Sequence, residues 1–143
     1  MSIDGPSVEE LRHGPTLVAL IVRSGYRANG AQFFTEHTLS QQVGCIRRPR
    51  GHIIAPHVHN RVRREVEYTQ EVLLIRSGRM QVELFDRTGA FMARRILDAG
   101  DLILLASGGH GFEMLEETEF FEIKQGPYTP DDDKTFLTTR VTG

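Results

Sequence analysis

Two histidines separated by a single residue, His57 and His59, are the side chains of this sequence best placed to do chemistry together. On an extended strand, residues i and i+2 point to the same face and lie roughly 7 Å apart along the backbone. Two imidazoles placed in this way can converge on one ion, at about 2.0–2.1 Å from each ring nitrogen. Taken alone, the pair is a weak signal, and two surface or hydrogen-bonded histidines would be the better explanation.

A glycine and a carboxylate accompany this pair. Gly51 lies six positions before His57, and Glu71 opens an apolar run that ends at Gly78, seven positions further on. The run reads Glu71-Val72-Leu73-Leu74-Ile75-Arg76-Ser77-Gly78, a pattern that favours a strand followed by a tight turn.

A second block of the sequence brings another histidine. The residues 100–105 form an apolar run entered from a Gly-Asp turn, and Ala106-Ser107-Gly108-Gly109 then leads to His110. The two blocks, in this order and within about residues 44–125, resemble the two motifs of the cupin superfamily. The resemblance implies one cupin domain over residues 1–143, with residues 1–40 as an N-terminal extension.

The resemblance also implies a fold and a set of metal ligands. The fold is a double-stranded β-helix, which is a jelly-roll barrel, and the ligands are His57, His59, Glu71 and His110. Three imidazoles and one carboxylate suit a divalent transition metal such as Fe(II), Mn(II), Ni(II) or Zn(II). Open coordination positions would admit water or an anionic, bidentate ligand.

Two other carboxylates compete with Glu71 for the ligand position. Glu65 and Glu67 lie closer in sequence to the histidine pair. We prefer Glu71 because the apolar strand and the seven-residue step to Gly78 begin there.

Several polar residues near these motifs are candidates for contacting a substrate. Arg61, Arg63 and Arg64 lie between the histidine pair and Glu71, and arginine favours planar contact with carboxylate or phosphate. Tyr68 and Lys124 are further candidates for the mouth of a pocket. A solvent-facing loop would explain the arginines equally well.

The elements that must position these residues are short strands. Gly-marked turns at spacings of 8–12 residues predict an all-β sandwich or small barrel. The expected strands are Leu17–Arg23, Gln32–His37, Gln41–Arg47, Val66–Arg76, Arg79–Arg87, Ala90–Leu97, Leu102–Ala106, His110–Leu115 and Phe120–Gln125.

Two further structural expectations concern the ends of this strand series. The capping box Ser7-Val8-Glu9-Glu10 predicts a short N-terminal helix that stops before His13-Gly14-Pro15. Apolar residues of the last strands are expected to pack the core; they are Phe112, Met114, Phe120, Phe121 and Ile123.

Composition excludes several classes of protein. A chain of 143 residues suits one domain, and a net charge of −2 lacks the basic footprint of a nucleic-acid binder. The single cysteine, Cys45, excludes an intramolecular disulfide framework. No apolar run approaches the roughly 20 residues of a membrane span, and Met1–Glu10 is too polar for a signal peptide. We therefore expect a soluble cytoplasmic protein, with no nucleic-acid or membrane partner.

Charge is unevenly distributed along the chain. Arginines crowd the middle, at positions 47, 48, 50, 61, 63 and 64, whereas glutamates crowd the C-terminal part, at positions 113, 116, 117, 119 and 122. We expect both groups of charged residues to lie on solvated faces, and the arginines and glutamates also to pair with each other within a homodimer.

The expected function is that of a small metal-binding cupin acting on a small polar or anionic metabolite, such as a sugar derivative. The resemblance implies dioxygenase, isomerase or epimerase, or lyase chemistry, and the residues do not choose among these. Two alternatives stay open. One is a non-catalytic ligand-binding or sensor protein, and the other is a metal-independent sugar epimerase of the same fold that uses a histidine base and a tyrosine acid.

Overall fold

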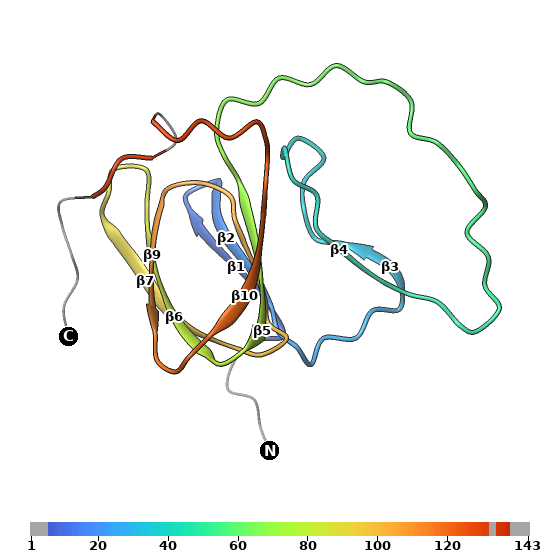
Figure 1. Ribbon diagram of the computed structural model, residues 1–143, viewed down its shortest axis with the longest axis horizontal. Helices are drawn as coiled ribbons and strands as arrows, with labels where there is room; N and C mark the ends of the chain where they lie inside the picture. The colour runs from blue at the N-terminus through green and yellow to red at the C-terminus, as the bar shows by residue number, and fades with distance from the viewer. Residues whose placement is uncertain (1–5, 132–133, 138–143) are drawn as a thin grey trace. The chain divides into compact units, whose positions relative to one another are not determined.

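The computed structural model describes residues 6–131 and 134–137, and these residues form β-strands without any helix (Figure 1). The strands are β1 (Val8–His13), β2 (Thr16–Val22), β3 (Gly30–Phe33), β4 (Gly44–Arg47), β5 (Glu71–Ser77), β6 (Arg79–Phe85), β7 (Phe91–Asp98), β8 (Leu102–Leu105), β9 (Gly109–Met114) and β10 (Glu119–Lys124). The described part of the chain thus contains no helix of the length and apolar character that crossing a membrane requires. The chain divides into two compact units, residues 1–26 with 69–143, and residues 27–68.

The first unit is built from two antiparallel sheets. One has five strands in the order β1-β2-β8-β5-β10, and the other has three in the order β7-β6-β9. In the larger sheet Leu73 pairs with Ile103, and Ile103 pairs with Ile21, so these side chains share one face of the sheet. In the smaller sheet Met80 pairs with Leu97 on the facing side.

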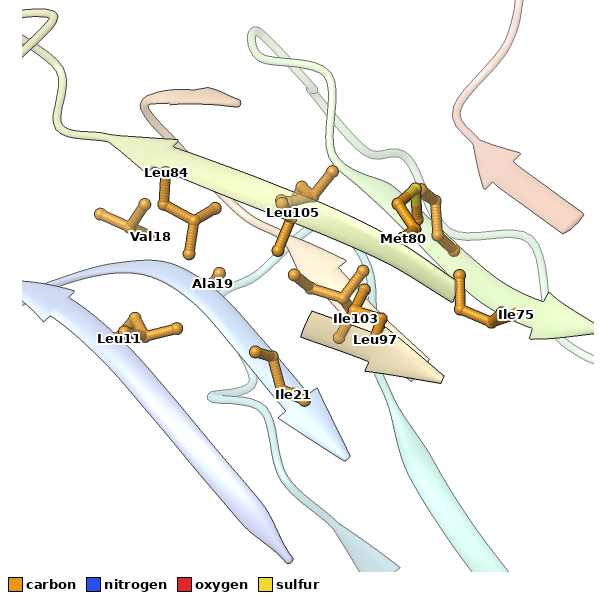
Figure 2. Packing of buried hydrophobic residues seen from close by; sticks show 12 residues of the cluster. Leu11, Val18, Ala19, Ile21, Ile75, Met80, Leu84, Leu97, Ile103 and Leu105 are labelled. Atoms are coloured by element: carbon orange, nitrogen blue, oxygen red, sulfur yellow. The ribbon is translucent and has the colours of Figure 1, made fainter. Parts of the chain in front are cut away.

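The apolar faces of these two sheets pack against each other to form the core. Figure 2 shows this packing, with Ala19 and Ile21 of β2 on one side and Met80 and Leu84 of β6 on the other. The fully buried side chains of the cluster are each less than 2% exposed, and burying one such side chain contributes about 1.5–3 kcal/mol. The core therefore holds the two sheets in a fixed relation.

The strand alternation that builds this core also places polar residues on its inner faces. On β5, Leu73 and Ile75 are core residues, and Glu71 stands on the same face two positions earlier. On β9, His110 pairs with the buried Leu84. Both polar residues therefore project from facing sheets, at one end of the apolar core.

The second unit contains the antiparallel pair β3 and β4, in which Gln32 pairs with Cys45. Its connecting loop is held by Thr35, whose hydroxyl accepts from Val43 N at 3.1 Å and donates to Gln42 Oε1 at 2.9 Å. After Arg47, the rest of this unit contains neither strand nor helix.

The predicted N-terminal helix is wrong, because the segment forms strand β1. Glu9 pairs with Ile21 and Leu11 with Ala19 in an antiparallel hairpin, and Leu11 is buried in the core. Gly14, at φ 59°, makes the hairpin turn. A capping box stabilises a helix start only locally, and here pairing with β2 and burial of Leu11 outweigh it.

Two other expectations need correction. The strand expected from Val66 begins at Glu71, so residues 66–70 lie outside it. Phe112 and Phe120 pack on the core as predicted, but Met114, Phe121 and Ile123 are 44%, 51% and 56% exposed. For Phe121 and Ile123 the reason is parity, since on β10 they alternate with Phe120 and therefore face away from the core.

An ion pair between the sheets makes stability depend on pH. Arg95 of β7 donates to both carboxylate oxygens of Glu9 on β1, at 3.0 and 2.9 Å. This hydrogen bonding outweighs the effect of burial and lowers the pKa of Glu9. The pair contributes about 1 kcal/mol above the pKa of an unfolded glutamate, and this contribution is lost as the pH falls through the lower folded pKa. Glu9→Gln should therefore lower the free energy of unfolding at pH 7 and flatten its decline between pH 5 and 3, measured by urea denaturation. An unchanged acid slope would contradict this.

Candidate functional site

A carboxylate and an imidazole from different sheets meet at one end of the core of the first unit. Glu71 Oε2 on β5 lies 3.5 Å from His110 Nε2 on β9, and Lys124 Nζ on β10 lies 3.9 Å from Glu71 Oε1. The side chains of Glu71, His110 and Lys124 are 13%, 31% and 24% exposed, so solvent reaches the group. The three residues are 39 and 14 positions apart in sequence, and the fold brings them together.

Glu71 is held in position by the residue before it. Gln70 is buried; its backbone N–H donates to Gln125 Oε1 at 2.8 Å, and its side-chain amide donates to the carbonyl of Ala106 at 3.3 Å. Glu71 itself pairs with Lys124 on one side and Leu105 on the other. The start of β5 is therefore fixed on both edges, which restricts where the carboxylate can point.

His110 is positioned by the turn that precedes it. Gly108 has φ 72°, and a Cβ atom there would collide with the carbonyl oxygen of Phe85, so the turn requires glycine. Two residues along the strand, the ring of Phe112 lies 5.3 Å from the His110 ring, centroid to centroid. Phe112 in turn packs on the core, which gives the imidazole a rigid apolar neighbour.

The two carboxyl groups at this site, those of Glu71 and Glu122, have pKa values shifted in opposite directions. Hydrogen bonding with His110, which outweighs burial, lowers the pKa of Glu71 and keeps it ionised at neutral pH. Partial burial, together with the nearby Glu71 charge and a hydrogen bond to it, raises the pKa of Glu122. The site thus combines one stable carboxylate with a second carboxyl group that holds a proton more readily.

Glu122 is a member of this site that the sequence-based prediction missed. It lies on β10 two residues before Lys124, and so both side chains share the face that carries the core residue Phe120. The alternation of Phe120, Glu122 and Lys124 with two apolar residues is visible in the sequence, but the sequence does not show which of the two rows faces the core. Glu122 and Lys124 follow Phe120 on the inward-facing side of β10, so they lie where the apolar core ends and the polar site begins.

Lys124 also interacts with an aromatic residue beyond the end of β10. Its ammonium group lies 5.0 Å from the ring centroid of Tyr128. The ammonium group of Lys124 is thus held between the Glu71 carboxylate and an aromatic face.

The histidine pair lies in the second unit. The ring centroids of His57 and His59 are 5.3 Å apart in an edge-on arrangement, and His57 Nδ1 lies 2.8 Å from the carbonyl oxygen of Ala55. Because a carbonyl only accepts hydrogen bonds, this contact assigns the proton of neutral His57 to Nδ1. Its Nε2 then presents a lone pair, which is the state that a metal ligand needs.

The remaining candidates also lie in the second unit. Arg61, Arg63, Arg64 and the rival carboxylates Glu65 and Glu67 are all exposed residues of the strand-free segment, and Tyr68 is 69% exposed. Of the predicted ligands and substrate contacts, the structure brings Glu71, His110 and Lys124 together in the first unit.

Among residues 6–131 and 134–137, no three His, Cys, Asp or Glu side chains form a group arranged to hold a metal ion. Comparison with known proteins adds no relative. No protein-family model matches the chain, and no curated protein or solved structure matches it.

Proposed function

We propose that this protein is a cupin-type metalloprotein that binds a small, oxygen-rich anionic metabolite through a divalent transition metal held by His57, His59, Glu71 and His110. The observation that carries the proposal is the 3.5 Å approach of Glu71 and His110 from facing sheets. Two of the four expected ligands, distant in sequence, therefore share one location at the solvent-accessible end of the core.

The chemistry of the donor set supports this proposal. Glu71 is kept ionised by its neighbours, and the contact with the carbonyl of Ala55 places the proton of a neutral His57 on Nδ1, which leaves Nε2 as the donor for coordination. Three nitrogen donors and one oxygen donor fit Fe(II), Mn(II), Ni(II) or Zn(II). A bound ion would supply Lewis acidity toward substrate oxygens.

The protein's own residues would then bind the ligand and supply a proton to it. Lys124 provides a positive charge beside Glu71 for an anionic group, and Glu122 provides a carboxyl group that can donate a proton beside the same position. Arg61, Arg63 and Arg64 add planar donors for carboxylate or phosphate from the strand-free segment. The ligand class that fits these groups is a hydroxy acid, an enediol or a phosphorylated sugar.

Metal content tests the proposal. We expect protein purified without chelator, and then reconstituted with Zn(II), Mn(II), Fe(II) or Ni(II), to retain about one ion per chain after gel filtration, measured by inductively coupled plasma mass spectrometry. The control is the double variant His57→Ala/His59→Ala, which should retain far less. Wild-type protein that retains none of the four metals would contradict the proposal.

One observation favours a second candidate, metal-independent acid–base chemistry. The contact of Glu71 with His110 is the kind that orients an imidazole for proton transfer. Such an enzyme would bind its ligand equally well in the presence of EDTA, whereas the metalloprotein would lose ligand binding.

A further inference from the structure

The chain returns to the candidate site after its last strand. Residues 134–137, which we call the C-terminal strap, contain neither strand nor helix and belong to the same compact unit as Glu71 and His110. Figure 1 shows the chain after β10, in dark red, reaching from the end of that strand to the side where β7 and β9 lie. Because β10 and β9 both contribute side chains to the site, a segment that reaches both strands passes close to it.

One end of the C-terminal strap lies on the β10 side of the site. Burial and the charge of Glu71 raise the pKa of Glu122, and the positive charge of Lys134 counteracts this rise. Such an effect falls off with distance, so Lys134 lies near the Glu122 carboxyl group. Tyr128, which precedes the strap, also contacts the site through its ring, 5.0 Å from Lys124 Nζ. The chain therefore follows the edge of the site that Glu122 and Lys124 form.

The other end of the C-terminal strap is seated next to His110. A Cβ atom added to Gly109 would lie 2.9 Å from Leu137 Cδ1, and one added to Gly89 would lie 3.7 Å from Leu137 Cδ2. The Leu137 side chain therefore uses space that Gly109 leaves open, one residue before His110. Unlike Gly108, Gly109 does not have a positive φ, so its backbone conformation does not require glycine. Space for the Leu137 side chain thus gives glycine a structural role at this position.

We propose that the C-terminal strap closes over the site of Glu71 and His110 and opens to admit the ligand, with Leu137 seated on Gly109 as its latch. The inference rests on the proposed function only in treating this site as a ligand site. The His110 side chain is 31% exposed, so the closed strap narrows access to the site rather than sealing it. Leu137 is itself 47% exposed, so its seat is partial, and opening needs only the local release of the strap. A strap that closes again over a bound ligand excludes water and strengthens the electrostatic contacts of the site.

The reactivity of His110 toward diethylpyrocarbonate, a small reagent that acylates neutral imidazole, tests the latch. Gly109→Ala places a methyl group against Leu137 Cδ1 and 3.4 Å from Phe85 Cβ, so the flexible end of Leu137 should give way. Leu137→Ala removes the latch from the other side of the contact. Because either change releases the strap, we expect His110 to be modified at least about 5-fold faster in both variants at pH 7. Mass spectrometry of the peptides measures the rate, with His37 of the second unit as an internal reference for the reagent.

A second glycine of β9 provides a matched control. Gly111→Ala makes the same change on the other side of His110, where an added Cβ atom would meet no atom of the described residues within 4 Å. This variant should keep the wild-type rate, and circular dichroism should show that all three variants are folded. Wild-type rates in both Gly109→Ala and Leu137→Ala would overturn the proposal. An equal rise in Gly111→Ala would overturn it as well, since strand β9 would then be loosened as a whole.

The experiment is carried out without added metal, so its result is separate from the test of the proposed function. Protein that retains no metal, but whose His110 reacts faster in the two latch variants, would overturn the proposed function and support the strap. Protein that retains metal, but whose His110 reactivity is unchanged in those variants, would overturn the strap and support the proposed function.

Discussion

Glu71→Gln should weaken metal binding by at least roughly 100-fold at pH 7, since losing a ligand exceeds the 10–100-fold effect of losing an outer partner. Glutamine preserves the size of the side chain and can still contact His110, but it removes the negative charge that balances a divalent ion. The affinity is measured at pH 7 by competition with a chromophoric chelator.

Two matched variants serve as controls for this result. Glu65→Gln and Glu67→Gln make the same chemical change at exposed residues of the strand-free segment, and each should leave the affinity unchanged. If one of them weakened binding more than Glu71→Gln, the ligand carboxylate would be that residue, and the contact between Glu71 and His110 would be structural.

Asp101→Ala should lower the free energy of unfolding by about 3 kcal/mol, because it removes three hydrogen bonds that a buried carboxylate accepts. Asp101 is 4% exposed and accepts hydrogen bonds from the backbone of Ser24 and Asp98, both at 2.8 Å, and from Arg23 at 3.1 Å. These contacts join the end of β2 to the turn before β8. Urea denaturation followed by circular dichroism measures the change.

The neighbouring aspartate provides the comparison. Asp98 pairs with Arg79 at 2.8 Å, but both side chains are about half exposed, so solvent screens the interaction. Asp98→Ala should cost less than about 1 kcal/mol. If the two variants lowered the free energy of unfolding equally, burial would not be the reason that the Asp101 carboxylate stabilises the fold.

Most of the strands were predictable from local pattern. From β5 to β9 the strands are short and separated by turns that contain glycine, and Gly78, Gly89 and Gly100 all have positive φ in those turns. Such signals act over a few residues, and the long-range pairing of the sheets agrees with them. The same locality explains the error at Ser7–His13, where a helix cap is a strong local signal but the hairpin with β2 decides the outcome.

The site was predictable in part. Glu71 and His110 stand out by the runs that carry them, whereas Glu122 lies within a strand and is recognised only when its neighbours' faces are known. The exposure of Phe121 and Ile123 was hidden for the same reason, since composition marks a residue as apolar but does not say which side of the sheet it occupies. Which side faces the core depends on the whole sheet.

The double attachment of Gln70 has a consequence for how this protein can diversify. Because backbone and side chain are both fastened, at Gln125 and Ala106, insertions or deletions upstream need not displace Glu71. Length changes in surface connections cost little entropy. Selection could therefore remodel ligand preference by editing the preceding stretch, while the carboxylate stays in register with its histidine.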